Sequence, residues 1–426
     1  MQLQPWRGRL VVLVGIVLAA LNLRIAVASV SPILGLVRED VVLSAAQVGL
    51  LGTVPVASFA VFGSLATPLA RRIGLEPAIV LAMAVSAAGE ALRATAGSAP
   101  SFLGWSVAAL AGLGMGNVLL PPLVKRYFPD RIGAVTAAYS VALPISTALP
   151  PLVAVPLAQQ AGWRVAVGVW AVLGVVAVVP WLVVIVRSVQ ARARLRNLLG
   201  RAPVATGSDA PDVLGARPAD PRLVWGSPHA WALAVMFGMN ALGTYATFAW
   251  LPELLVADGY PAEVGGRWLA LFAILGLPAS FVLPVLAQRV RNPFWVVAGF
   301  CVVWAAGYLG LILSPHAGLP VWMVLLGIGP GSFPLFLALI GLRSADASVA
   351  VTLSGMVQGV GYALAGFGPI GVGLVVERTG SWDLALWLLL GTLVVLVAAA
   401  WRACRPGVIG ARPPREHGSS GPDRVA

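Results

Sequence analysis

Twelve long apolar runs divide this chain of 426 residues, and they constrain its fold more than any other feature. A helix needs about 20 mostly apolar residues to cross the hydrocarbon core of a bilayer. The runs are continuous rather than alternating, so they predict helices and not barrel strands. The expected spans are 10–36, 45–69, 77–96, 101–124, 132–158, 163–186, 229–256, 266–287, 294–313, 319–341, 347–376 and 383–403. The sequence therefore predicts an all-α polytopic membrane protein with 12 transmembrane helices.

The composition supports a membrane protein. Hydrophobic residues make up 59% of the chain and charged residues 10%, whereas soluble domains carry about 25% charged residues. So few charges cannot cover a surface exposed to water, which excludes a soluble enzyme, a disordered chain and a nucleic-acid-binding protein. The cysteines and histidines show no disulfide, metal-ligand or catalytic spacing. We therefore expect no metal, no cofactor and no enzymatic activity.

The positive charges indicate the orientation in the membrane, because Lys and Arg concentrate in cytoplasmic segments. If the N-terminus lies inside, the inner segments carry Arg7, Arg9, Arg71, Arg72, Lys125, Arg126, Arg131, Arg289, Arg291 and Arg343, and many more in the longest break and the tail. The outer loops carry few. We therefore expect a multi-pass protein of the plasma membrane, surrounded by the lipid bilayer, with both termini in the cytoplasm.

An internal repeat divides the chain into two halves. Gly112–Asn117 in the fourth span corresponds to Gly327–Ser332 in the tenth, and Asp130 and Asp346 follow at nearly the same interval. Two six-helix halves in parallel repeat are the layout of a major facilitator transporter. The expected domains are a six-helix half at 1–186, a cytoplasmic linker at 187–228, a second half at 229–404 and a disordered cytoplasmic tail at 405–426. The glycines of the repeat predict close helix packing.

Charged residues inside the spans are candidates for function. A charge near the bilayer centre costs at least about 3 kcal/mol, so it needs a partner or an aqueous cavity. Arg24 lies near the middle of the first span. Its guanidinium could bind an anionic or strongly dipolar substrate, or it could have a structural role, paired with a carboxylate or with carbonyls at a helix end. Glu253 is a candidate for proton coupling, or else an interfacial residue. Glu90 and Arg93 are one helical turn apart, and we expect them to pair with each other.

Polar residues in other spans could either bind a substrate or hold helices together. They are Asn117, Tyr139, Ser140, Asn240, Tyr245, Trp250, Gln358 and Tyr362. Gln358 and Tyr362 are four residues apart and therefore share one helix face. Prolines within the spans, such as Pro121, Pro144, Pro278 and Pro330, are expected to break or bend their helices.

Several segments together resemble the cyanate and 2-nitroimidazole transporter (CynX/NimT) family of the major facilitator superfamily. They are Asn22–Arg24 with Ser29–Pro32, Gly114–Pro121 through Asp130, Trp250–Pro252, Leu353–Gln358 with Gly361–Tyr362, and Gly380–Trp382. The resemblance implies passage of cyanate-like anions or nitroaromatic heterocycles by alternating access. It also leads us to expect a substrate site at Arg24, Asn22, Asn117, Tyr139, Gln358 and Tyr362, with Trp250 near its outer side.

The loop after the second span resembles the cytoplasmic gating motif of the superfamily. Gly63, Leu65, Arg71 and Arg72 match that motif, but Thr67 stands in place of its aspartate. Because this carboxylate is missing, we predict a cytoplasmic gate in which Arg71 or Arg72 pairs with Asp130.

The sequence thus favours a secondary active transporter, acting as a monomer, that moves a small anion or a small polar heterocycle. One alternative is a proton-coupled multidrug or toxic-compound efflux pump, although carboxylates are missing from spans one, two and four. Another is a membrane receptor that binds a ligand without moving it.

Overall fold

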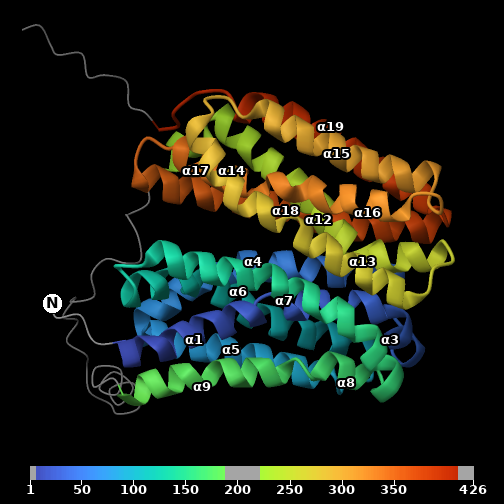
Figure 1. Ribbon diagram of the computed structural model, residues 1–426, viewed down its shortest axis with the longest axis horizontal. Helices are drawn as coiled ribbons and strands as arrows, with labels where there is room; N and C mark the ends of the chain where they lie inside the picture. Colours follow the sequence, from blue (N-terminus) through green and yellow to red (C-terminus); the bar gives the residue numbers. More distant parts are fainter. Residues whose placement is uncertain (1–5, 188–220, 411–426) are drawn as a thin grey trace, which may run out of the picture.

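The computed structural model describes residues 6–187 and 221–410, and the regular elements of this part of the chain are helices (Figure 1). Within these described residues, twelve helical segments are long and apolar enough to cross a membrane. They coincide with the twelve runs expected from the sequence, so the prediction of an all-α protein with twelve spans is confirmed.

The first six spans are formed by residues 6–187. Their elements are α1 (Trp6–Asn22), α2 (Ile25–Ala28), η1 (Ser31–Ile33), α3 (Leu34–Asp40), α4 (Ala45–Ile73), α5 (Leu75–Arg93), α6 (Ala99–Tyr127), α7 (Ile132–Ala161), α8 (Trp163–Gly168) and α9 (Ala171–Arg187). The first span is therefore not one helix, because the chain leaves helical structure at Leu23 and Arg24 and resumes it at Ile25.

The last six spans lie within residues 228–403. Their elements are α12 (Pro228–Ala257), α13 (Ala262–Leu275), α14 (Leu277–Arg289), α15 (Phe294–Leu313), α16 (Leu319–Ile328), η2 (Gly329–Ser332), α17 (Phe333–Leu342), α18 (Ala347–Thr379) and α19 (Trp382–Ala403). A short helix, α11 (Pro221–Trp225), precedes them.

The two sets of spans form two bundles, with their helices running side by side along the long axis of the molecule (Figure 1). We name the membrane side at which α1 begins and α19 ends the terminus side, on the left in Figure 1. The opposite side, where α3 and α8 lie, is the far side. The bundles are joined mainly by α4 with α18 and α7 with α13. A site between the halves is therefore framed by these four helices.

Small residues allow the helices of each half to approach closely, as the repeat predicts. A Cβ added at Gly112 of α6 would lie 2.2 Å from the carbonyl oxygen of Ala82 of α5. In the second half, a Cβ at Gly329 would lie 2.3 Å from Trp304 Cγ. Glycine is needed at both positions because any side chain would force neighbouring helices apart.

The prolines interrupt fewer helices than expected. The helices α6, α7 and α18 continue through their prolines, whereas the eighth span is interrupted at Gly276, before Pro278, and the tenth at Gly329–Ser332, around Pro330. Neighbouring helices in a membrane bundle can satisfy the backbone groups that a proline frees, so a proline need not end a helix there.

Two chain segments differ from the expected domain layout. Most of the expected linker lies outside the described residues, but its last part includes the helix α11. The first residues of the expected disordered tail are ordered: the Ile409 N–H donates to the Arg343 carbonyl at 2.7 Å, and the Ala345 N–H donates to the Ile409 carbonyl at 3.0 Å. The tail therefore begins as a strap bound to the loop between α17 and α18; residues 411–426 lie outside the described residues.

Candidate functional site

Polar contacts join the two halves on the far side. The Ser31 hydroxyl donates to the Ala249 carbonyl at 2.9 Å, and the Thr53 hydroxyl of α4 donates to the Gly366 carbonyl of α18 at 2.6 Å. The side chain of Gln159 on α7 donates to Glu263 on α13. The far side of the interface between the halves is therefore closed.

Glycines make this closure tight. A Cβ at Gly52 of α4 would lie 2.6 Å from Pro369 Cβ and 2.8 Å from Ala249 Cβ, both in the second half. A Cβ at Gly266 of α13 would lie 2.4 Å from the Pro151 carbonyl oxygen of α7. The closed interface thus depends on direct backbone approach between halves.

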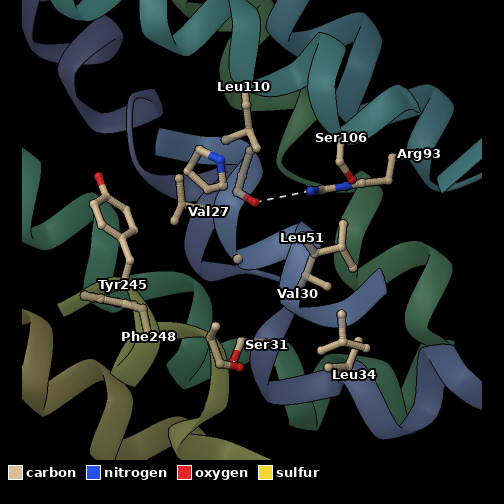
Figure 2. A pocket seen from close by; sticks show the side chains of 15 residues that line it. Val27, Val30, Ser31, Leu34, Leu51, Arg93, Ser106, Leu110, Tyr245 and Phe248 are labelled. Atoms are coloured by element: carbon tan, nitrogen blue, oxygen red, sulfur yellow. Dashed lines mark hydrogen bonds between the residues drawn. The ribbon is translucent and has the colours of Figure 1, made fainter. Parts of the chain in front are cut away.

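A small cavity, about 50 Å³, lies at this interface between the halves (Figure 2). The first half contributes Arg93 and Ser106 to one side, and the second half contributes Tyr245 and Phe248 to the opposite side (Figure 2). Apolar side chains such as Val27 complete the wall. A mostly apolar lining with a few polar groups is also found in small-molecule sites, whose volumes of about 300–1,000 Å³ are much larger.

Arg24 stands at the break of the first span. Its backbone N–H donates to the Ser146 hydroxyl at 3.2 Å, and its guanidinium carbon lies 5.0 Å from the centre of the Phe59 ring. No carboxylate forms an ion pair with Arg24 among the described residues, and its side chain is only partly buried. The positive charge is thus held by an aromatic face and remains available to an anion.

Residues of the second half lie across from Arg24. Tyr362 of α18 is within electrostatic range of both Arg24 and Tyr245. Tyr362 and Gln358 lie four and eight residues before Gly366 and so share the face of α18 that contacts α4. They lie closer to the terminus side than Gly366 does. The amide of Gln358 donates to the Ser354 hydroxyl at 2.7 Å. Arg24 and Tyr362 therefore interact electrostatically across the two halves.

Asn117 lies on the cavity side of α6. It follows Leu110, which lines the cavity, by seven residues, and so occupies nearly the same helix face two turns away. Its side chain is partly buried. This position is compatible with the substrate-binding role predicted for Asn117.

Three other predicted site residues point elsewhere. Asn22 is fully buried inside the first half, where its amide contacts the sulfur of Met83 at 3.6 Å. The indole N–H of Trp250 donates to the Pro369 carbonyl at 2.8 Å, and its ring packs on Trp382. Tyr139 packs against the apolar core of the first half. A substrate role for these residues has no direct support from the geometry.

The charged residues Glu253 and Arg93 differ in their surroundings. Glu253 forms an ion pair of 3.3 Å with Arg38 of the other half, at the far side, as an interfacial residue would. Arg93 does not form the expected ion pair with Glu90: it donates to the Ala26 carbonyl and the Ser29 hydroxyl, both at 3.2 Å, and lines the cavity. Sequence reasoning missed Arg93 as a cavity residue, although the hydroxyl of Ser29 in the first span was a signal for its partner.

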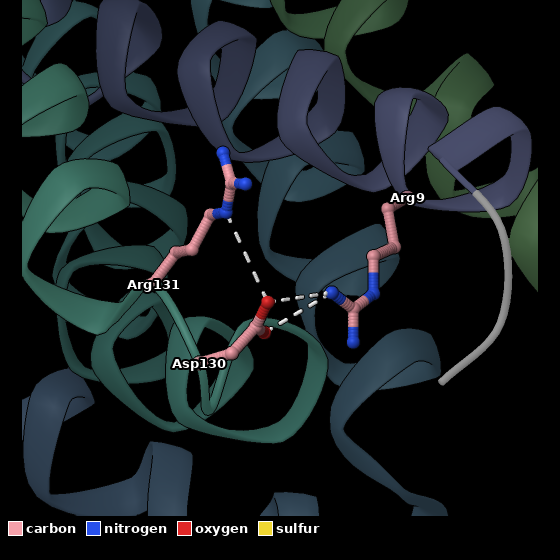
Figure 3. A network of polar contacts seen from close by, with 3 residues as sticks. All are labelled: Arg9, Asp130 and Arg131. Carbon is pink, nitrogen blue, oxygen red and sulfur yellow. Dashed lines mark hydrogen bonds and ion pairs between the residues drawn. The ribbon is translucent and has the colours of Figure 1, made fainter. Parts of the chain in front are cut away.

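Asp130 does not pair with the arginines predicted for the gate. It accepts two hydrogen bonds of 3.0 Å from Arg9 and lies 3.9 Å from Arg131. Figure 3 shows Asp130 between the two arginines. A backbone hydrogen bond, followed by the bonds from Arg9, holds the pKa of the Asp130 carboxyl below its usual range. Arg71 and Arg72 are exposed at the end of α4. The predicted pairing is therefore wrong for this conformation, because Arg9 of α1 lies closer to Asp130.

Comparison with known proteins decides the family. Residues 12–366 match the Major Facilitator Superfamily. The chain belongs to this superfamily. It is 34% identical to the uncharacterised transporter YycB of Bacillus subtilis over 92% of both chains. It is 31% identical to the 2-nitroimidazole transporter of Escherichia coli over 89% of this chain and 92% of the relative, and 25% identical to the cyanate transport protein CynX of the same organism over 86% and 90%.

Solved structures share the fold at low sequence identity. The nucleoside transporter NupG gives a TM-score of 0.71 at 13% identity and covers 93% of this chain and 98% of its own. A bacterial homologue of the human lysosomal transporter Spinster gives 0.67 at 17% identity, covering 94% and 96%. The chain is thus a multi-pass membrane transporter of the CynX/NimT type, and not an enzyme.

Proposed function

We propose that this protein is a secondary active transporter of a small anion or a small, strongly dipolar heterocycle, and that Arg24 binds the substrate. The observation that carries this proposal is the partly buried guanidinium at the break of the first span, which has no carboxylate partner among the described residues and lies within electrostatic range of Tyr362 of the other half. A cation in this position is stabilised by an incoming anion.

The relatives support this choice of substrate. The names of two of them state transport of 2-nitroimidazole and of cyanate. Cyanate is a small anion and suits the guanidinium of Arg24, whereas a planar nitroaromatic ring suits stacking on an aromatic side chain such as Tyr362. Both are small enough to be enclosed between two halves that close over a narrow site.

The closed far side supports alternating access. We propose that the terminus side is cytoplasmic, because the inner segments defined by this choice carry most of the arginines. The conformation described is then closed to the outside. Opening the outside requires α4 to leave α18 and α7 to leave α13, since these pairs make the far-side contacts. Each half contributes to the site, so one copy of the chain suffices for transport.

Uptake into proteoliposomes tests the proposal. The wild type should exchange labelled cyanate or 2-nitroimidazole. Arg24→Ala should weaken anion binding by about 10- to 150-fold, because a hydrogen bond to a charged group contributes about 1.5–3 kcal/mol. Arg289→Ala is the matched control, because Arg289 is exposed at the end of α14. Equal anion transport by both variants would contradict the role of Arg24.

The same assay distinguishes the alternative function. If substrate binding does not need the guanidinium of Arg24, the apolar cavity wall favours a proton-coupled exporter of apolar drugs. This wall includes Val27, Leu51, Leu110 and Phe248. Transport of uncharged heterocycles and dyes by Arg24→Ala at the wild-type rate would favour that exporter.

A further inference from the structure

Glu90 of α5 is a fully buried carboxyl group that lacks a hydrogen-bond partner among the described residues. Its side chain is 0% exposed, and both of its oxygens are unpartnered. An ionised carboxylate in such surroundings loses its hydration and gains no hydrogen bond in exchange, whereas the neutral acid loses far less. The carboxyl group therefore holds its proton in this conformation.

The cation nearest in sequence does not neutralise Glu90 by direct contact. Arg93 lies one turn further along α5 and is 1% exposed, but its two terminal nitrogens donate to Ala26 and Ser29 of the first span. The remaining nitrogen, Nε, is buried without a partner among the described residues. Arg93 is thus held by the first span and could turn to Glu90 only if those bonds were released.

The position of Glu90 on α5 places it behind the break of the first span. Met83, seven residues earlier on the same face, contacts Asn22, and Arg93, three residues later, binds Ala26. The face of α5 between these contacts is turned towards residues 22–26. Arg24, within that segment, directs its guanidinium to Phe59 of α4. Glu90 therefore lies behind the non-helical segment that carries the proposed substrate cation, Arg24.

Other charged groups on the packed elements lie away from Glu90. Arg71 and Arg72 on α4, Lys125, Arg126 and Tyr127 on α6, and Arg187 on α9 lie at the terminus-side ends of their helices. Arg164 on α8 lies on the far side, where it pairs with Asp40. The one charge that acts on Glu90 among the described residues is Arg93. Protonation of Glu90 is therefore governed by its burial and by the position of Arg93.

We propose that Glu90 binds the proton that couples transport to a proton gradient; this inference rests on the proposed transport function. With the far side closed, Glu90 is protonated and Arg93 is bound to the first span. When the far side opens, the segment around residues 22–29 moves, Arg93 is released to pair with Glu90, and the carboxyl passes its proton to water. No bond other than the O–H bond changes: water on the far side accepts the proton when that side is open, and hydronium from the terminus side supplies it when the far side is closed.

The fold gives this proton a short route. Glu90 lies one turn before the far end of α5, which ends at Arg93. Arg93 in turn lines the interfacial cavity. Opening of the far side thus brings water to the carboxyl group past the same arginine that pairs with it.

The test is Glu90→Gln, an isostere of the protonated acid, in proteoliposomes. Two assays are compared with the same substrate: exchange at equal pH on both sides, which needs no net proton movement, and accumulation driven by a pH difference. One coupled proton supports up to about tenfold accumulation for each unit of pH difference. We expect Glu90→Gln to retain exchange and to lose this accumulation.

The control is Glu76→Gln on the same helix. Glu76 is buried as well, but it has partners in the Tyr127 hydroxyl at 2.6 Å and in Arg126 at 3.3 Å. This variant should keep gradient-driven accumulation. Accumulation by Glu90→Gln at the wild-type level would overturn the proposal. Loss of exchange as well, in protein with an unchanged melting temperature, would also overturn it, because Glu90 would then serve the transport step itself.

A measurement without substrate separates this proposal from the proposed function. In infrared difference spectra between high and low pH, the purified wild type should show the carbonyl band of a buried protonated carboxylic acid, and Glu90→Gln should lack it. If the wild type transports none of the probes but shows this band, the substrate assignment fails while the proton site remains. Absence of the band from the wild type would refute the proton site.

Discussion

A single methyl group at Gly52 should shift the equilibrium between the closed and the open far side. In the closed conformation the new Cβ of Gly52→Ala would lie 2.6 Å from Pro369 Cβ, 2.8 Å from Ala249 Cβ and 3.0 Å from Pro369 Cγ. These are rigid atoms next to the backbone, so the helices themselves must separate. The clash is confined to the closed far side, because α4 and α18 part when it opens.

The magnitude follows from this geometry. Overpacking a tight contact by one methyl group costs about 1–3 kcal/mol. Alanine also favours the helix over glycine by up to about 1 kcal/mol, but this gain is present in both conformations and cancels. The ratio of closed to open far side should therefore fall by about 5- to 150-fold.

Distances between spin labels on the far side measure this shift. Labels at Val42, which is 87% exposed, and at Glu377, which is exposed at the end of α18, report the separation of the two halves. Gly104→Ala on α6 is the control, since a Cβ there meets nothing within 4 Å. We expect Gly52→Ala to enrich the long distances and Gly104→Ala to leave them unchanged. Identical distributions in both variants would refute the packing argument.

Three further predictions concern single side chains. Arg38→Gln should remove the partly exposed ion pair with Glu253, worth about 0.2–1 kcal/mol, and so raise the open population by at most about fivefold in the same spin-label assay. Burial raises the pKa of the Cys404 thiol to about 12. Maleimide at neutral pH should therefore react with this thiol at least about tenfold more slowly in the folded protein than after unfolding, as followed by mass spectrometry. The lowered pKa of Asp130 means that its contact with Arg9 is present above the usual pKa and is lost as the pH falls through the lowered value. The difference in melting temperature between wild type and Asp130→Asn should therefore stay constant from pH 8 to about pH 5, and a difference that already disappears in that range would contradict this account.

The sequence was sufficient to predict the membrane spans because few backbone structures can cross a bilayer. A continuous apolar run long enough to cross it must be helical, so run length alone located twelve spans. The break at Leu23 and Arg24 was not predicted, since neither residue stops a helix by itself. It is accompanied by tertiary contacts, such as that of the Arg24 N–H with Ser146 of α7, which local sequence does not reveal.

The candidate site was predicted in part. Arg24 stood out because a charge within a membrane span needs a partner or an aqueous cavity. The spacing of Gln358 and Tyr362 indicated that they share one face of their helix, and α18 is indeed continuous over both residues. The roles of Asn22 and Trp250 could not be predicted, because a polar group in a span can bind either a substrate or another helix. Both residues contact another helix. The spacing of Glu90 and Arg93 predicted a local pair, but the carbonyl of Ala26 and the hydroxyl of Ser29 compete for the arginine.

Ligand-dependent stabilisation of the purified protein tests the central role of Arg24 most directly. A ligand that binds only the folded protein at a hundred times its dissociation constant adds about 2.7 kcal/mol of stability and raises the melting temperature. Cyanate or nitrate should stabilise the wild type and Arg289→Ala, and fail to stabilise Arg24→Ala. Equal stabilisation of all three proteins by these anions would contradict the assignment of Arg24 as the anion-binding residue.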